Sequence, residues 1–127
     1  MAEETYPEDL RYHAEHDWVR VDGDTGTFGI TWYAQDALGE VVFFDPPEVG
    51  TQVTRDQAYA EVESVKAVSD VFAPLSGEVV EVNDGLGDSP EKINEDPYGE
   101  GWLVKVRLSD TSELDALLDV NAYKELL

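Results

Sequence analysis

The sequence predicts a mainly β protein of the small sandwich or barrel type, with helices at its ends. Short runs rich in β-branched and aromatic residues recur along the chain, and turn residues separate them at short intervals. The 127 residues, 42% of them hydrophobic, are enough to build one core. No apolar run approaches the length of a membrane span. We therefore expect a single domain over residues 1–127.

The first half of the chain contains alternating apolar runs interrupted by a short helical segment. Gly39 is the expected stop of that helix, because glycine adopts the left-handed conformation that commonly ends helices. The paired prolines after residue 45 end the strand that follows, since proline has no N–H for a sheet ladder. In order, we expect an N-terminal arm over 1–12, strands at 17–21 and 27–31 around a turn at 22–26, a helix at 32–38 and a strand at 40–44.

The second half of the chain predicts a hairpin, a strand pair and a helical C-terminus. Its middle is rich in Gly, Pro, Asp and Asn, which favours a long ordered surface loop with at most one helical turn. The segment Ser109–Ser112 offers N-cap side chains for the terminal helices. In order, we expect strands at 58–63 and 68–73, a turn at 74–77, a strand at 78–83, a loop at 84–101 with a helical turn at 90–93, a strand at 102–108, and C-terminal helices within 111–127, at 113–118 and 120–127.

Lys66 is the most informative single residue. It lies between Val65 and Ala67, where the two strands of the predicted hairpin meet, in a chain with only four lysines. No Asn-Gly or Asp-Gly pair stands there to form an ordinary two-residue turn. Most lysines are solvated surface charges. A lysine at the tip of a stiff hairpin, however, is well placed to present its amine to a modifying enzyme.

The charge balance excludes several classes of partner. Eight basic residues stand against 29 acidic ones, for a formal net charge of −21. Such a chain repels nucleic-acid phosphates and anionic membrane surfaces. Two explanations of the charge stay open, namely steering onto basic partner clefts and adaptation to a salt-rich cytoplasm. The acidic and polar N-terminus is unlike a signal or transit peptide, so we expect a cytoplasmic protein.

Neither a metal site nor a catalytic site is expected from the residues. The chain has no cysteine, which excludes zinc-thiolate centres and cysteine nucleophiles. His13 and His16 have helical ligand spacing but lie between an arm and a strand, without a third ligand. The segment Asp22–Asp24 starts like a calcium loop, yet Tyr33 stands where the last ligand, a glutamate, belongs. We therefore expect a turn there.

Several blocks, in the right order, resemble the H protein family of the glycine cleavage system. The block Glu63–Asp70 resembles the lipoyl-lysine motif of that family, and the resemblance extends over nearly the whole chain. A biotinyl domain would carry methionines beside the lysine, and the lipoyl domains of 2-oxo-acid dehydrogenases usually carry an aspartate before it. The other matching blocks are His16–Arg20, Gly29–Thr31, Tyr33–Phe43, Ala73–Val79, Val82–Asn83 and Asn94–Leu103.

The resemblance implies a fold, a cofactor and a set of partners. The fold would be the barrel-sandwich hybrid of lipoyl domains. Lys66 would carry lipoate in amide linkage, and the protein would be a non-catalytic carrier that shuttles the aminomethyl group of glycine. Its partners would be glycine decarboxylase (P protein), aminomethyltransferase (T protein), dihydrolipoyl dehydrogenase (L protein) and a lipoate-attaching enzyme. No nucleic acid, membrane or metal enters this expectation, and a monomer is expected.

Three further residues acquire roles through the resemblance. Glu63 corresponds to a position implicated in recognition by the lipoate-attaching enzyme. Asp17 and Asp70 correspond to acids that line the cleft of the loaded arm. Members commonly have glutamate where Asp17 stands, so the reach of this side chain is shorter by one methylene. Two alternatives stay open: a similar carrier that hands lipoyl or octanoyl groups to other proteins, and an interaction module that uses its acidic face.

Overall fold

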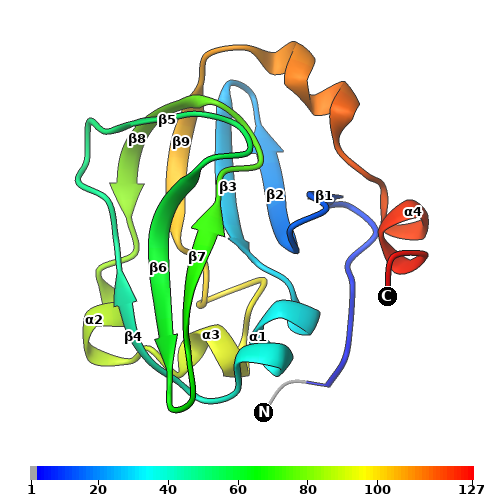
Figure 1. Cartoon of the computed structure of the whole chain (residues 1–127). Helices are drawn as coiled ribbons and strands as arrows, with labels where there is room; N and C mark the ends of the chain where they lie inside the picture. The colour runs from blue at the N-terminus through cyan, green and yellow to red at the C-terminus, as the bar shows by residue number, and fades with distance from the viewer. Residues whose placement is uncertain (1–2) are drawn as a thin grey trace.

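The structure is a computed structural model that describes residues 3–127, and it consists of two antiparallel sheets (Figure 1). The larger sheet has the strand order β1-β2-β3-β9-β8-β5, and the smaller one has the order β4-β6-β7. Neither sheet closes on itself. The strands are β1 (Arg11–Tyr12), β2 (Asp17–Asp22), β3 (Thr25–Ile30), β4 (Val41–Asp45), β5 (Gln52–Val53), β6 (Ala58–Ser64), β7 (Val68–Phe72), β8 (Gly77–Val82) and β9 (Val104–Leu108).

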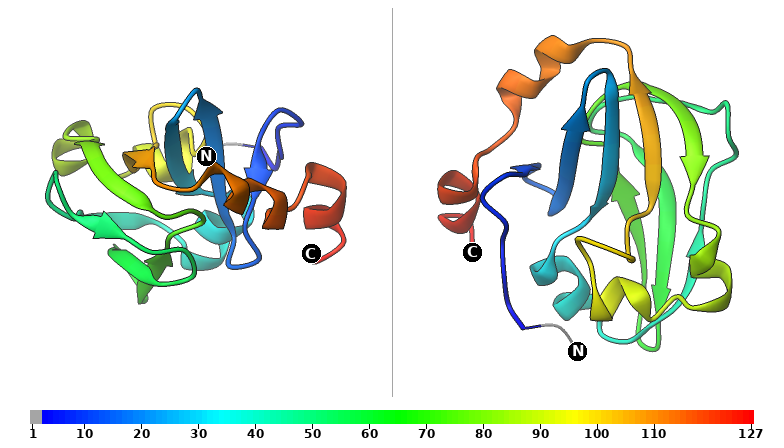
Figure 2. Two further views of the ribbon diagram at one scale, coloured as in Figure 1. Left: turned by 90° about the horizontal axis from the view of Figure 1, so that it is seen from above. Right: turned by 180° about the vertical axis from the view of Figure 1, so that it is seen from behind.

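The two sheets face each other across the main core, as the two views of Figure 2 show. The core consists of side chains from both sheets, among them Phe28 and Val106 from the larger sheet and Val62 from the smaller one. These three are fully buried, and alternate residues of their strands point to this interior. The predicted mainly β fold is therefore confirmed, although the two-residue strands β1 and β5 were not foreseen.

Helix α1 (Trp32–Leu38) has the bounds that its sequence predicts. The Thr31 hydroxyl accepts a hydrogen bond from the backbone N–H of Ala34 (3.3 Å) and caps the first turn. Gly39 ends the helix at a φ of +84°, and its N–H donates to the Gln35 carbonyl. The helix joins β3 to β4 and thereby connects the two sheets.

The segment predicted as a loop with one helical turn instead holds two short helices, α2 (Gly85–Asp88) and α3 (Lys92–Glu95). Each helix buries an apolar side chain in the main core, Leu86 from α2 and Ile93 from α3. Strand β9 begins at Val104, two residues later than predicted. Tertiary burial, rather than local propensity, stabilises these four-residue helices.

The C-terminus contains the 3₁₀ segment η1 (Thr111–Ala116) and the short helix α4 (Val120–Lys124), where the sequence predicted helices at 113–118 and 120–127. It runs outside the larger sheet, past β2, toward the N-terminal segment (Figure 1). A backbone bridge joins Tyr12 to Leu118, with both N–H groups donating at 2.8 Å. No helix within residues 3–127 is both long and apolar enough to cross a membrane.

An aromatic cluster attaches this C-terminal segment to the rest of the molecule. Tyr6, Leu10 and Tyr12 are buried in it, so the described part of the expected N-terminal arm is packed rather than loose. The ring of Tyr123 stacks on that of Tyr12 at 4.7 Å between centroids. The Tyr123 hydroxyl contacts Thr31 Oγ1 (2.7 Å) and His16 Nδ1 (2.8 Å). Helix α4 is thus connected to the N-terminus of α1.

We predict that Tyr123→Phe lowers the free energy of unfolding by about 1–3 kcal/mol, because it removes both hydrogen bonds and leaves buried polar groups without partners. Tyr12→Phe is the matched control, since it keeps the same ring stack and removes only the bond to the Pro7 carbonyl. Urea unfolding above the titration range of histidine measures both. A Tyr123→Phe cost no larger than that of Tyr12→Phe would contradict the prediction.

Candidate functional site

The tip of the β6–β7 hairpin holds Lys66, as the sequence predicts, and lies at the same end of the molecule as α1 and α3 (Figure 1). Val65, Lys66 and Ala67 form the connection between the strands, and all three are exposed. The backbone N–H of Val65 donates to the Glu40 carbonyl (3.0 Å), which fastens the tip to the start of β4. The lysine therefore projects from an anchored turn.

Ser64 organises this turn from inside and was not singled out by sequence reasoning. Its side chain is buried, and its hydroxyl accepts hydrogen bonds from the N–H groups of Lys66 (3.3 Å) and Ala67 (3.1 Å). The backbone N–H of Ser64 donates to the Ala67 carbonyl at 2.8 Å. A serine hydroxyl that binds nearby backbone groups commonly shapes a tight turn. The only available sequence signal is a serine placed two residues before the tip.

The Lys66 side chain extends from the tip along the C-terminal end of α1. A β-carbon built on Gly39 would stand 3.5 Å from Lys66 Cε, an ordinary van der Waals contact. Lys66 forms no ion pair with any residue in the range 3–127. Lys92 pairs with Glu95 and Glu100, and Lys105 pairs with Glu81, whereas Lys124, like Lys66, forms no ion pair within residues 3–127. Its position at the anchored hairpin tip is what distinguishes Lys66 from Lys124.

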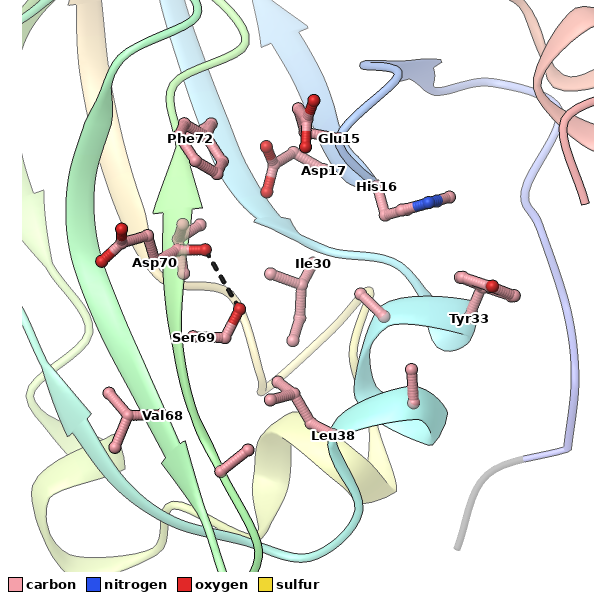
Figure 3. A pocket seen from close by; sticks show the side chains of 14 residues that line it. Glu15, His16, Asp17, Ile30, Tyr33, Leu38, Val68, Ser69, Asp70 and Phe72 are labelled. Atoms are coloured by element: carbon pink, nitrogen blue, oxygen red, sulfur yellow. Dashed lines mark hydrogen bonds between the residues drawn. The ribbon is translucent and has the colours of Figure 1, made fainter.

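A cleft of about 390 Å³ begins beside the hairpin tip and extends between β7, α1 and the start of β2 (Figure 3). Both acids that the sequence nominated, Asp17 and Asp70, line it. The rest of its lining was not predicted and is largely apolar, apart from four polar or titratable residues, Glu15, His16, Tyr33 and Ser69. The lining residues are Glu15, His16, Asp17, Ile30, Tyr33, Ala34, Ala37, Leu38, Ala67, Val68, Ser69, Asp70, Val71 and Phe72.

The two nominated acids occupy different environments. The Asp17 side chain is 1% exposed and points into the space between β7 and β2, whereas Asp70 is exposed and its carboxyl lies on the other side of β7 (Figure 3). Asp70 is directly opposite Glu61 in the sheet register, on the outer face. Burial, and to a smaller extent Glu15, raises the pKa of Asp17 well above its ordinary value.

His16 adopts a backbone conformation that histidine rarely takes, with a φ of +73°. Its ring lies against Tyr33 at the rim of the cleft, 4.5 Å between centroids, and Nδ1 contacts the Tyr123 hydroxyl. Burial lowers the pKa of His16. His13 makes a separate contact, Nε2 to Asp56 Oδ1 at 2.5 Å. The two histidines therefore do not converge, and residues 3–127 contain no cluster of metal-binding side chains.

Glu63 lies on the outer face of the smaller sheet, close to the tip. In the sheet register it is flanked by Phe43 on β4 and Val68 on β7, whose exposed fractions are 54% and 59%. Directly opposed residues of antiparallel strands point to the same face. Val65, at the tip, is 65% exposed. Glu63 is thus a carboxylate set among exposed apolar side chains, close to Lys66.

Comparison with known proteins connects this geometry to one family. The family model described as glycine cleavage H-protein matches residues 10–127. The glycine cleavage system H protein of Halorhodospira halophila is 57% identical over 122 residues, covering 95% of this chain and 94% of that protein. A probable H protein of Haloarcula marismortui is 55% identical over 119 residues, covering 94% of each chain. The crystal structure of the Mycobacterium marinum H protein superimposes with a TM-score of 0.85 at 40% identity, covering 94% and 97% of the two chains.

We predict that Ser64→Ala loosens the hairpin tip without unfolding the protein. Losing the hydroxyl removes the partner of two backbone N–H groups, and one hydrogen bond contributes about 1 kcal/mol. Amide hydrogen exchange at Lys66 and Ala67 should therefore accelerate about fivefold, measured by NMR. Ser69→Ala is the control, because the Ser69 hydroxyl donates only to the neighbouring Asp70 carbonyl. Equal exchange in both variants would refute this role of Ser64.

Proposed function

The chain belongs to the glycine cleavage H-protein family and acts as a lipoyl carrier in glycine cleavage, and we propose that Lys66 is the residue that bears the lipoate. The observation that carries this assignment is an exposed lysine at an anchored hairpin tip, directly beside a cleft. Lys66 is free of ion pairs within residues 3–127, so its amine is open to acylation.

The residues around Lys66 fit an apolar arm with a polar end. The cleft begins at Ala67, next to the attachment point, so an arm on Lys66 would reach it. Ile30, Leu38 and Phe72 form apolar walls, and Asp17 supplies a buried polar group at the inner end. When bound, lipoate supplies a cyclic disulfide that thiolate or another nucleophile opens. The protein contributes a shape that shields the arm and acids that attract an amine.

We assign the cleft to the amine-loaded form of the arm. An amine is largely cationic at neutral pH, and a carboxylate in a desolvated cleft attracts it more strongly than in water. Asp17 would act at close range from inside the cleft, and Asp70, whose carboxyl lies on the other side of β7, would act through longer-range attraction. This acid-lined cleft favours a carrier of the aminomethyl group over a carrier that only hands on lipoyl or octanoyl groups, because an acyl chain has no cation to hold.

The carrier would itself perform no catalysis and would serve the three enzymes of the system in turn. Glycine decarboxylase, aminomethyltransferase and dihydrolipoyl dehydrogenase are the proposed partners, with a lipoate-attaching enzyme acting before them. We place this cycle in the cytoplasm. The net charge of −21 would draw the carrier to basic partner surfaces, through long-range attraction that weakens with salt. A plain interaction module would need neither the free lysine nor the adjoining cleft.

We assign recognition by the lipoate-attaching enzyme to Glu63 and its apolar neighbours. Phe43 and Val68 flank Glu63 on the outer face, and all three are exposed. An enzyme that acylates Lys66 must contact the tip, and this surface is the nearest one that combines apolar area with a fixed charge. Glu63 lies three residues from Lys66 on the same strand and turn.

Lys66→Arg should abolish lipoylation and glycine cleavage in a reconstituted system, while the fold stays intact. Arginine keeps the positive charge and similar length, but its guanidinium stays protonated and is a poor nucleophile. Intact mass and glycine decarboxylation assays report the two losses. Lys92→Arg is the control and should behave like the wild type. If the Lys66→Arg variant still gains a lipoyl adduct or retains activity, the assignment of Lys66 fails.

Glu63→Ala should slow lipoylation severalfold through a higher KM of the attaching enzyme for the carrier, with little change in stability. Surface substitutions of this kind usually change the free energy of unfolding by no more than about 0.5 kcal/mol. Glu61→Ala, two residues away on the same face, is the matched control. Steady-state lipoylation kinetics and thermal melting measure both variants. Indistinguishable kinetics of the two variants would remove Glu63 from the recognition surface.

A further inference from the structure

Asp17 is a buried carboxyl group without a compensating charge. Its side chain is 1% exposed, and Oδ2 has no hydrogen-bond partner among the described residues. No ion pair formed within residues 3–127 includes it. Arg20, the basic residue nearest in sequence, lies over the Trp18 ring and donates to the Tyr98 carbonyl. Nothing in the described structure neutralises a negative charge at this position.

The surroundings of Asp17 add acids rather than cations. The hydroxyl oxygen of Tyr59, on β6, is also buried and, like Asp17 Oδ2, has no hydrogen-bond partner among the described residues. Burial lowers the pKa of His16, the one titratable base in the lining. The titratable groups facing Asp17 are Glu15 and His16 from its own segment, Tyr33 from α1, Tyr59 from β6 and Tyr123 from α4. Asp70 on β7 also lines the cleft, but its carboxyl lies on the other side of that strand.

An isolated carboxylate in such a place is costly, so the neutral acid is favoured while the cleft is empty. The raised pKa of Asp17 has this burial as its main cause. A cation brought into the cleft would reverse the preference, because an opposite charge at close range favours ionisation. The unpartnered Oδ2 at the cleft floor is the atom on which such a cation would be held.

We propose that Asp17 is a neutral acid in the empty cleft and ionises only when the cationic amine of the loaded arm docks, so that docking releases one proton to solvent. The inference rests on the proposed carrier function and adds a proton-linked regulation of its cleft. In this step the O–H bond of the Asp17 carboxyl breaks and its proton passes to water. The ammonium group keeps its own proton, and no other bond changes.

Through this coupling, binding of the amine produces the negative charge that holds it. When an arm without an amine enters the cleft, Asp17 stays neutral, so no unpaired carboxylate is buried. When an arm with an ammonium group enters, Asp17 ionises and the two charges attract. Because docking releases a proton, docking strengthens about tenfold per pH unit as the pH rises toward the raised pKa of the empty cleft. Above that pKa, Asp17 contributes no further dependence on pH.

The direct test is an NMR titration of the Asp17 side-chain carboxyl carbon in unlipoylated, lipoylated and amine-loaded protein. Asp17→Asn assigns the signal, since the titrating resonance disappears. The inference requires a pKa above the ordinary aspartate value of about 3.9 in the first two forms, and a fall of at least one unit in the loaded form. An ordinary pKa in the unloaded protein overturns it, as does a raised pKa that loading leaves unchanged.

The stability of the unlipoylated protein gives a second readout that needs no cargo. A carboxyl whose folded-state pKa is raised contributes stability that is fully present below its unfolded pKa and is lost as the pH rises through the folded pKa. Asp17→Asn cannot ionise, so it escapes that loss. Its melting temperature relative to wild type should therefore increase as the pH rises through this window. Asp36→Asn, which removes an exposed carboxyl on α1 outside the cleft lining, is the control, and the trend in Asp17→Asn should exceed it. A trend equal in both variants would overturn the neutral-acid assignment.

The decay of amine-loaded protein measures the functional consequence. The rate at which each loaded protein loses its aminomethyl group, divided by that of the free loaded cofactor, should fall with rising pH in the wild type and in Asp36→Asn. It should stay flat in Asp17→Asn. If the wild-type ratio is below one but does not change with pH, the cleft protects the loaded arm without the proton coupling. That result overturns the coupling and leaves the carrier function intact. A protein that is never lipoylated at Lys66 would instead overturn the proposed function, and the pKa of its empty cleft would still decide the state of Asp17.

Discussion

The buried side-chain amide of Asn94 is the interaction on which the placement of the hairpin tip depends. Its Nδ2 group donates to Gln35 Oε1 (2.9 Å) and to the Gly39 carbonyl (2.9 Å), and its Oδ1 accepts from the N–H of Val41 (2.8 Å). One residue of α3 thereby joins the end of α1 to the start of β4. The next carbonyl along this connection, that of Glu40, receives the N–H of Val65. Because unpaired polar groups are costly in a core, this network fixes the tip beside the cleft.

The excess of acidic residues places like charges side by side on the smaller sheet. On the outer face of the smaller sheet, Asp45, Glu61 and Asp70 lie directly opposite one another across three strands. Like charges in such positions destabilise a sheet, yet no ion pair within residues 3–127 relieves them. The folding free energy therefore does not account for this row. Both explanations of the charge, partner steering and a saline host, predict such a solvated acidic face, so the row fits either.

The sequence predicted those features that local chemistry determines. Helix α1 has the expected bounds because Thr31 and Gly39 are strong start and stop signals, and the lysine hairpin follows from its β-branched runs. Helices α2 and α3 were missed because tertiary burial of Leu86 and Ile93 holds them, not propensity. At the site, the hairpin-tip position of Lys66 was expected from the residues, and a cleft position for Asp17 was expected only from the family resemblance; the roles of both residues stay predictions. The burial of the Asp17 carboxyl was not foreseen, since it depends on strands distant in sequence. The organising hydroxyl of Ser64 was missed although its partners, Lys66 and Ala67, are local, because serine is common in turns of many kinds.

The two ends of the proposed arm path differ in dielectric environment, and this difference explains why the residues there are of opposite kinds. At the tip, Lys66 is exposed, so its charge costs little before the proposed acylation. At the other end, Asp17 is enclosed, so a charge on it is costly unless a cation lies nearby. A carrier must bind its cargo firmly enough to protect it and release it to each enzyme in turn. A permanent ion pair at the floor would oppose release of every form of the arm, whereas an acid that ionises with the cargo discriminates between loaded and empty forms.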